Sequence, residues 1–515
     1  KIEVPAKWNR FDLSALDETG SAAEVFAVEL HQRLSVPIGI ILATEPRTSI
    51  ESWISPASNK TKSAGMFNAM IAPLARVSFS GVIWDHGESN LNHSVQYRRL
   101  LPLLIHDWRS VFHDDNLPFL IVQLRARKFS DSELSSEKEP SHNRLDEKPL
   151  LRLNPQAAAE LREAQASVLN GWRLNPYEED DTVHVKDHVI TMAPGQAMTG
   201  ATWDGPITRM NYEISLDAKR IAGEDFFCGL TFPVGPECCS LILGGWAGQV
   251  VGLSSLDYLD ASQNETSRRM NFEMDRWYSV RVRVTPFRIE AWLDGKSIVD
   301  AVTTNRQIDI RLTVSPSKPL GVATYFTTGA FRNFTSRILT PVPMGSSSRK
   351  RSLQQIALPK TGIAVTVDLG AEPSSSRLGK RLFHLAMTNA YHQKDLYWPS
   401  PAFESMEIEK EQIRIRFRRL DFFMDQQGEL SGFTIASARG RWRPANAKIE
   451  SSRGDYRSTV VVSAPGVEQP QAVRYLWQDL PTVSGGFLYR DDGMPVIPFQ
   501  AGNRVGRAVP ARRMK

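Results

Sequence analysis

The chain has 515 residues, which is too long for a single hydrophobic core and corresponds to about three or four domains. Hydrophobic residues make up 41% and charged residues 23%, proportions typical of a globular protein rather than a disordered one. The longest apolar runs, such as residues 36–43, are far shorter than the ~18 residues that cross a bilayer, so we expect no membrane span.

Net positive charge is concentrated at the carboxyl end. The chain has 62 Lys and Arg against 57 Asp and Glu. Five of the basic residues and no acidic residue lie within 504–515, so the rest of the chain is neutral. A neutral body argues against nucleic acid as a partner, because a nucleic-acid groove needs clustered Lys and Arg. We expect residues 503–515 to form a solvated basic tail.

The cysteines are too few for a disulfide scaffold. They are Cys228, Cys238 and Cys239, and no histidine cluster at zinc spacing accompanies them. One disulfide from Cys228 to either neighbour and three buried thiols are both compatible with the sequence. We expect neither a metal nor a cofactor.

From residue 21 to 170 the pattern alternates between helix and strand. Ser21 and Glu24 form a capping box at the start of a helix, and residues 36–42 are a continuous apolar run typical of a strand buried on both faces. The alternation predicts a parallel sheet covered by helices on both faces. Residues 128–149 lack periodicity and predict a mobile surface loop. The remaining predicted elements are a helix over 63–75, a strand over 78–84, a helix over 94–110, a strand over 117–124 and a helix over 156–169.

Around residue 171 the hydrophobic period changes from 3.6 to 2. Every second residue from 278 to 284 is apolar, and Asp294-Gly295 between two apolar runs predicts a two-residue hairpin. Many short strands between residues 203 and 338 indicate a β-sandwich.

The helix–strand alternation resumes after the sandwich. Residues 362–370 predict a buried strand and 377–391 a helix, which would complete the interrupted sheet. The predicted fold is therefore multidomain α/β plus β, with the sandwich inserted into the α/β domain. The expected boundaries are 1–170 and 353–397 for the α/β domain, 172–340 for the inserted sandwich, 398–502 for a C-terminal β-rich domain and 503–515 for the tail.

Several ordered segments resemble the sialate O-acetylesterase family of SGNH hydrolases. This resemblance implies a flavodoxin-like, three-layer α/β domain, hydrolysis of acetyl esters on sugars, and export to the periplasm or the extracellular space. The segments that carry it are FNAMIAPL and GVIWDHGESN within 66–90, LLPLLIHDWR (100–109), PFLIVQL (118–124), LPKTGIAVTVDLG (358–370) and SAPGVEQPQAVRYLW (463–477).

The insert is similar to the 3-keto-disaccharide hydrolase-like domain, a concanavalin-type jelly roll. The similarity lies in DFFCGLTFPVG (225–235), LILGGWAGQVVGLSSLD (241–257) and RWYSVRVRVTPFRIEAW (276–292). A polar loop containing Asp257, Asp260, Asn264 and Glu265 could bind a sugar or a calcium ion through its oxygen atoms.

Two tryptophans of the insert have two interpretations. Trp246 and Trp292 could stack on sugar faces, or they could belong to the sandwich core. The core is favoured, because large aromatic residues dominate cores.

The esterase resemblance implies two donors for a tetrahedral oxyanion. Gly87 and Asn90 lie in DHGESN, just past the strand over 78–84, where open parallel sheets bind ligands. The backbone N–H of Gly87 and the amide of Asn90 would stabilise the oxyanion. Glu88 could contact a sugar hydroxyl or bond only to backbone.

The nucleophile and the base that the family uses are not found. We expect the family's Gly-Gln-Ser-Asn-type block upstream of Lys1, and its Gly-Gly-Thr reads Glu-Pro-Arg-Thr at 45–48. The loop at 371–376 contains no Asp-x-x-His, and an Asp-x-x-His at 181–184 lies at the edge of the insert. His384 falls within a predicted helix, where a packed histidine is favoured.

These observations lead to three hypotheses. The first is a hydrolase, an exported carbohydrate O-acetylesterase with a glycan as its substrate. The second is a non-catalytic glycan-binding protein in which a degenerate esterase scaffold carries a lectin-like domain. The third, weaker hypothesis is hydrolysis of a glycosidic bond by carboxylates of the insert.

Overall fold

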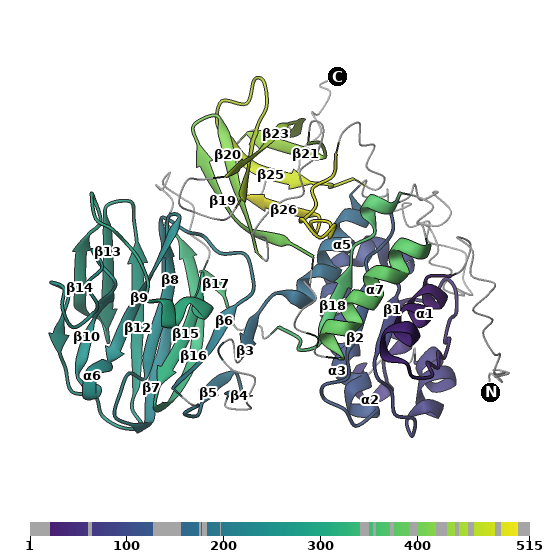
Figure 1. The fold of residues 1–515 in the computed structure, drawn as a ribbon, viewed down its shortest axis with the longest axis horizontal. Helices are drawn as coiled ribbons and strands as arrows, with labels where there is room; N and C mark the ends of the chain where they lie inside the picture. Colours follow the sequence, from purple (N-terminus) through teal and green to yellow (C-terminus); the bar gives the residue numbers. More distant parts are fainter. Residues whose placement is uncertain are drawn as a thin grey trace, which may run out of the picture. The chain divides into compact units, whose positions relative to one another are not determined.

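A computed structural model gives the fold of the chain (Figure 1). It divides into two compact units, residues 1–169 with 358–515, and residues 170–357. No helix among the described residues is long and apolar enough to cross a membrane. The predicted loop at 128–149 and the basic tail lie outside the described residues, which are 21–59, 64–126, 156–174, 177, 183–195, 197–339, 350–353, 357–370, 375–391, 393, 400–418, 430–437, 442–451, 458–478 and 486–502.

A parallel sheet forms the centre of the α/β part of the first unit. Its described strands are ordered β1 (Val82–Asp85), β2 (Phe119–Val122) and β18 (Thr361–Ala364). Strand β18 pairs in parallel with β2, from Thr361 opposite Phe119 to Ala364 opposite Val122. The prediction that the strand beyond the insert joins the sheet of the first 170 residues is therefore confirmed.

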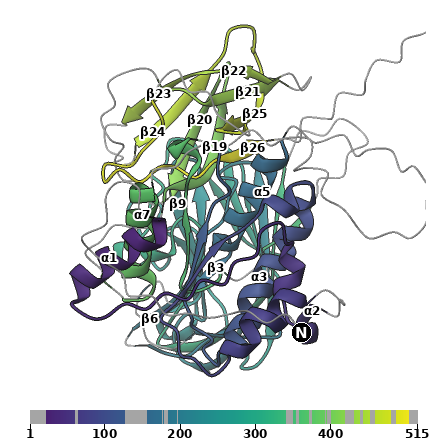
Figure 2. The ribbon, with the colours of Figure 1, turned by 90° about the vertical axis from the view of Figure 1, so that its right-hand side faces the viewer.

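Helices cover both faces of this sheet (Figures 1 and 2). Leu120 and Val122 of β2 pack with α1 (Ala22–Leu34) and α7 (Ser375–Asn389). Phe119 and Ile121 point to the opposite face and pack with α3 (Ser94–Val111) and α5 (Ala157–Ala166). The predicted capping box of Ser21 and Glu24 is present at the start of α1. Shorter helical segments are η2 (Ile50–Trp53), α2 (Pro56–Asn59), η5 (Glu88–His93), η6 (Ser167–Leu169) and η8 (Val367–Leu369).

The predicted strand at 36–42 is wrong. These residues form an irregular, largely exposed segment, and the side chain of Leu42 is 74% exposed. An apolar run becomes a strand only where a neighbouring strand accepts its hydrogen bonds, and none of the described strands pairs with this segment.

The predicted helix at 63–75 is helical over residues 65–74, but it is not one continuous α-helix. Its described part breaks into a π-helical turn, η3 (Phe67–Ile71), and a 3₁₀ turn, η4 (Ala72–Leu74). Pro73 lacks the N–H that a continuing α-helix requires.

Two four-stranded sheets form the C-terminal part of the first unit. The side chains between them share one core with α3 and α5, including Ile415, Val462, Val473 and Phe499. The described strand orders are β19 (Ala402–Glu409), β20 (Gln412–Arg418), β24 (Ser458–Ser463) and β23 (Asn446–Ser451), and β22 (Trp442–Pro444), β21 (Phe433–Ser437), β25 (Pro470–Tyr475) and β26 (Phe499–Gly502).

The second unit is a β-sandwich, and its core lies between two large sheets. The short turn α6 (Gly245–Gly248) and η7 (Leu312–Ser317) connect strands. In the described residues one sheet runs β11 (Arg268–Arg269), β10 (Val250–Ser254), β9 (Glu237–Gly244), β8 (Cys228–Val234), β15 (Gly321–Tyr325), β6 (Met198–Trp203) and β3 (Trp172–Leu174). The other runs β14 (Lys296–Val302), β13 (Arg288–Leu293), β12 (Trp277–Val284), β7 (Tyr212–Gly223), β16 (Thr327–Ile338), β5 (Val189–Met192) and β4 (Val183–Lys186), with β17 (Lys350–Ser352) also paired to β16.

The local predictions for the sandwich are confirmed. Alternate residues of β12 are buried, and β13 and β14 pair as an antiparallel hairpin. Asp294 and Gly295 have φ angles of 48° and 80°, as a type I′ turn requires. All three cysteines are free and buried, and burial raises the pKa of Cys228 and Cys239 to about 12. These thiols are therefore protonated and inert.

The chain enters and leaves the sandwich at adjacent points. Within the second unit, Ala357 N–H donates to the carbonyl oxygen of Trp172 (3.2 Å), and the Trp172 indole donates to the carbonyl of Leu353 (2.7 Å). Within the first unit, Leu358 N–H lies 3.4 Å from the carbonyl oxygen of Val168.

A glycine substitution tests the packing of α1 against α7. A Cβ atom at Gly379 would lie 2.6 Å from Val25 Cβ and 2.9 Å from the carbonyl oxygen of Ala22. We expect Gly379→Ala to lower the free energy of unfolding by about 1–3 kcal/mol, measured by urea denaturation. The control is Gly65→Ala, where no atom lies within 4 Å, and it should be neutral or slightly stabilising. Equal effects of the two variants would contradict this close packing.

Candidate functional site

The segment that follows β1 contains the predicted oxyanion donors. Gly87 and Asn90 lie directly past the carboxyl end of β1, at the start of η5 and ahead of α3. The carboxyl edge of a parallel sheet is the usual place for a ligand in such folds.

Gly87 has a backbone that other residues rarely adopt. Its φ is 155° and its ψ −27°, and a Cβ atom would lie 3.0 Å from Leu161 Cδ2 and 3.4 Å from Leu124 Cδ1. The residue is buried, and its N–H makes no hydrogen bond to any described residue. A buried N–H without a partner is uncommon, and here it leaves one backbone donor free to bind a ligand atom.

Asn90 is buried, and its amide makes two hydrogen bonds to described residues. The side-chain oxygen accepts a hydrogen bond from Ile50 N–H at 3.0 Å. The amide nitrogen donates to the Glu51 carboxylate at 3.3 Å, and Gln96 donates to the same carboxylate at 2.7 Å. Asn90 therefore fastens η2 to the loop after β1. The amide nitrogen has two N–H groups, and the one that does not bond to Glu51 has no acceptor among the described residues, so it can donate to an oxyanion.

His86 positions the neighbouring loop, and no sequence pattern indicates this role. Its Nε2 lies 2.9 Å from the carbonyl oxygen of Thr48, so Nε2 carries the proton. The ring stacks between Trp84 and Tyr97, at centroid distances of 5.0 and 5.9 Å. Burial lowers the pKa of His86 and so favours the neutral imidazole. His86 thereby positions the Glu-Pro-Arg-Thr loop at 45–48.

Two buried glutamines complete the carboxyl edge of the sheet. Gln165 of α5 accepts a hydrogen bond from Leu124 N–H at 2.8 Å and donates to the carbonyl of His86 at 2.9 Å, which ties the loops after β1 and β2 together. Gln123 follows β2 and is fully buried, and neither atom of its amide has a partner among the described residues. Its amide is therefore available to a polar ligand or water. Sequence reasoning missed both residues.

The third strand ends in a structural ion pair. Asp368 is almost fully buried and accepts two hydrogen bonds from Arg381, at 2.7 and 2.6 Å, and one from the Tyr489 hydroxyl at 3.0 Å. The sequence between Gly362 and Arg381 contains no histidine. His384 is half-buried within α7 beside Phe383. No described histidine of this region is thus placed after β18 as the family's base would be.

The polar groups of the sandwich loop are bonded to neighbouring protein groups. The Asn264 amide nitrogen donates to three backbone carbonyls, those of Leu253, Leu259 and Asp260. Asp257 and Glu265 both pair with Arg306. The described residues contain no group of three or more His, Cys, Asp or Glu arranged to hold a metal ion. Of the Asp-x-x-His at 181–184, Asp181 lies outside the described residues and His184 is exposed on β4.

The prediction that Trp246 and Trp292 belong to the sandwich core is wrong. Trp246 is 39% exposed, in the turn α6. Trp292 lies on the outer face of its sheet, where the guanidinium carbons of Arg281 and Arg283 are 4.0 and 5.0 Å from its ring centroid. The buried residues of β13 are Ile289, Ala291 and Leu293, so alternation along the strand places Trp292 on the outer face, and the expected core position rested on residue size alone.

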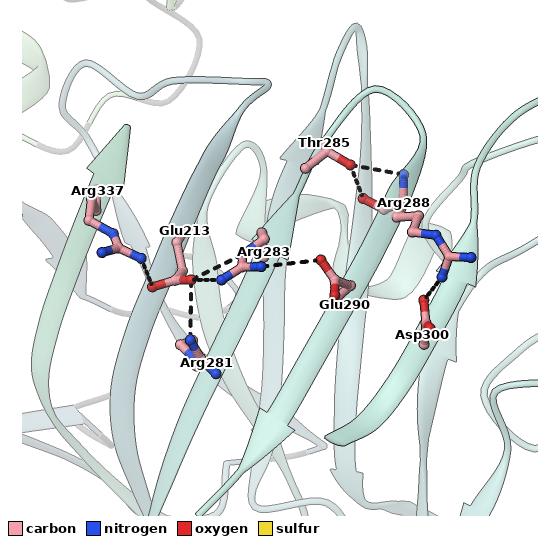
Figure 3. A network of polar contacts seen from close by, with 8 residues as sticks. All are labelled: Glu213, Arg281, Arg283, Thr285, Arg288, Glu290, Asp300 and Arg337. Atoms are coloured by element: carbon pink, nitrogen blue, oxygen red, sulfur yellow. Dashed lines mark hydrogen bonds and ion pairs between the residues drawn. The ribbon is translucent and has the colours of Figure 1, made fainter. Parts of the chain in front are cut away.

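A charged network crosses the same outer face (Figure 3). Glu213 of β7 is 8% exposed and accepts from Arg283 of β12 at 3.1 Å and from Arg337 of β16 at 3.0 Å. Glu290 of β13 continues the row beside Arg283. Opposite charges directly across neighbouring strands stabilise a sheet, so this network has a structural role.

The comparisons with known proteins match each unit to a different family. Residues 10–155 match the model of a carbohydrate esterase family, sialic acid-specific acetylesterase, and residues 166–337 match a 3-keto-alpha-glucoside-1,2-lyase-like domain. Each match covers about a third of the chain or less, so each unit is similar to a different family. Both resemblances found in the sequence are confirmed, and the first family is one of carbohydrate ester hydrolases.

The similar proteins cover only part of this chain. Human sialate O-acetylesterase is 34% identical over 136 residues, which are 21% of this chain and 26% of that protein. The mouse enzyme is 38% identical over 80 residues, 14% of this chain and 15% of its own length. The chain thus matches at most about a quarter of these curated relatives.

Solved structures are similar at low sequence identity. A carbohydrate acetylesterase from Xanthomonas citri has a TM-score of 0.47 and 20% identity, with 93% of this chain and 64% of that chain covered. A carbohydrate-binding module of Bacillus subtilis, CBM66, has a TM-score of 0.24 and 11% identity over 33% of this chain and 96% of its own.

The lowered pKa of His86 predicts how stability depends on pH. Near the ordinary histidine pKa of 6.5 the unfolded chain binds more protons than the folded protein. The stability that comes from keeping His86 neutral is therefore fully present above pH 6.5. As the pH falls below 6.5, the free energy of unfolding decreases by at most about 1.4 kcal/mol per pH unit. We expect His86→Gln to make the free energy of unfolding less dependent on pH between 7 and 5, measured by urea denaturation. The control His184→Gln removes an exposed imidazole and should keep the slope of the unmodified protein; an unchanged slope in His86→Gln would contradict the prediction.

Proposed function

We propose that this protein is a carbohydrate O-acetylesterase of the sialate O-acetylesterase type, which hydrolyses acetyl esters on sugar hydroxyls. The observation that carries the proposal is the unpartnered, buried N–H of Gly87 at the carboxyl edge of the sheet, within a domain of that family. Attack on an acetyl carbonyl creates a negative oxygen, and a fixed backbone N–H stabilises that charge.

Asn90 is the second proposed oxyanion donor. Its amide lies three residues along the same loop and is held in place by Ile50 and Glu51. The Gln123 amide supports this assignment, because it supplies a further buried polar group at the same edge of the sheet. The role assigned to this chain in the reaction is thus oxyanion stabilisation.

We infer that the α/β domain has the SGNH, flavodoxin-like architecture and is formed by residues up to 169 and by the chain from residue 358, since β17 and Leu353 belong to the sandwich. The parallel pairing of β18 with β2 supports this, since it unites segments on either side of the sandwich. The sandwich would then be an insertion over 170–357, and the two C-terminal sheets share the core of the α/β part. Export of the protein to the periplasm or extracellular space is proposed from the esterase family alone.

Acetate release tests the proposed reaction. The full-length protein should release acetate from 9-O-acetyl-N-acetylneuraminic acid faster than buffer does. Asn90→Ala should lower kcat/KM by about 10²–10³ if its amide stabilises the oxyanion. Gln96→Ala is the matched control, because it removes another amide bonded to Glu51 and should retain activity. Folding of each variant is checked by thermal unfolding. No release above buffer by the folded, unmodified protein would end the proposal.

A second candidate function is glycan binding without catalysis. Two observations favour it: Asp368 is committed to Arg381 and Tyr489, and one of the two N–H groups of the Asn90 amide is committed to Glu51. A glycan array with the full-length protein, run beside the acetate assay, separates the two. Binding of an acetylated sialoside that stays intact would support this candidate, and hydrolysis would rule it out.

A further inference from the structure

The turn α6 holds a tryptophan in a strained conformation. Trp246 and Ala247 have φ angles of 47° and 60°, and the flanking Gly244 and Gly248 have φ angles of 75° and 83°. Residues other than glycine lose about 1–3 kcal/mol in such regions of backbone space. This turn exposes part of a large apolar side chain to solvent, since Trp246 is 39% exposed. The turn thus places an aromatic side chain at the surface at a cost in backbone conformational energy.

A buried arginine fixes the shape of this turn. Arg220 is 5% exposed, and its Nη2 lies 3.3 Å from the carbonyl oxygen of Gly244 and 3.1 Å from that of Gly248. Its guanidinium lies 5.2 Å from the ring centroid of Phe227 and 5.8 Å from that of Phe272. The backbone of the turn that carries Trp246 is therefore held in place before any ligand arrives.

A second exposed aromatic residue lies on a neighbouring turn. Phe326, between β15 and β16, has a φ of 45° and is 51% exposed. Both turns border the loop between β7 and β8. Thr327 accepts a hydrogen bond from Asp225 N–H at 3.1 Å, and the carbonyl oxygen of Glu224 would lie 3.1 Å from a Cβ atom at Gly248. The two aromatic residues thus flank Glu224 and Asp225 at one end of the sandwich.

The polar groups between these aromatic residues are acidic. Asp225 is half-buried, and one oxygen of its carboxylate accepts from Phe226 N–H at 2.7 Å, while the other has no partner among the described residues. Glu224 is exposed. Carboxylates accept hydrogen bonds from hydroxyl groups and repel anions. The charge at this end favours a neutral polyhydroxylated ligand over an acidic one.

We propose that this end of the sandwich binds a neutral glycan, whose pyranose rings stack on Trp246 and Phe326 while ring hydroxyls donate to Asp225. Sugars of gluco or xylo configuration fit best, because equatorial hydroxyls leave flat C–H faces that pack against an aromatic ring. The site is separate from the esterase residues and does not depend on ester hydrolysis.

Calorimetric titration of the full-length protein with cellohexaose and xylohexaose tests the site. At least one of them should bind, and Trp246→Ala should weaken its binding by at least about tenfold, as loss of an aromatic anchor does. Trp246→Phe keeps an aromatic face and should bind more tightly than Trp246→Ala. Asp225→Asn keeps the oxygen that Phe226 N–H requires, and should weaken binding by removing the charged acceptor.

The matched control is Phe287→Ala. Phe287 is 69% exposed on the turn between β12 and β13. Because β12 is antiparallel to β7, with Val284 opposite Tyr212, this turn lies at the other end of the sandwich from the turn after Gly223. The control should bind as the unmodified protein does.

Three outcomes would overturn the proposal. They are no binding of either hexasaccharide, equal affinity of the Trp246→Ala variant and the unmodified protein, and displacement of a bound hexasaccharide by 3′-sialyllactose, an acidic glycan. Because Trp246 is exposed, Trp246→Ala should fold. Should it not fold, Asp225→Asn decides, and unchanged affinity in that variant would equally overturn the proposal.

Discussion

The parallel pairing of β18 with β2 is the contact on which the first unit depends. Four residues from beyond the sandwich bond to four residues before it, and α7 then covers the sheet beside α1. This pairing closes a loop of more than two hundred residues, whose ordering has an entropic cost. The buried side chains of Leu120, Val122 and Ala364 offset that cost by removing apolar surface from water.

The candidate site follows from the same sheet. Gly87, Gln123 and Asp368 each lie just past the carboxyl end of one of its strands. Their environments differ in kind: a free N–H at Gly87, an unpartnered amide at Gln123 and a satisfied ion pair at Asp368. Donors for a ligand thus lie past the ends of β1 and β2. Asp368, past the end of β18, instead connects the sheet to the C-terminal part through Tyr489.

Features set by local geometry could be predicted from the sequence. The capping box of Ser21, the alternation in β12 and the Asp294-Gly295 turn each depend on neighbouring residues only. Features that depend on distant partners could not: residues 36–42 are apolar but lack a described neighbouring strand, and His86 acts through Thr48. The exposure of Trp246 could not be predicted, because the backbone conformation of its turn depends on hydrogen bonds from Arg220, which is distant in the sequence.

The adjacent entry and exit of the chain at the sandwich has a consequence for the history of this architecture. Val168 and Leu358 are already neighbours, as are Trp172 and Ala357 on the other side of the junction. A whole β module could therefore have been acquired by a single genetic event, with no rewiring of the host sheet. The same geometry makes the junction a natural point for exchanging one module for another by recombination.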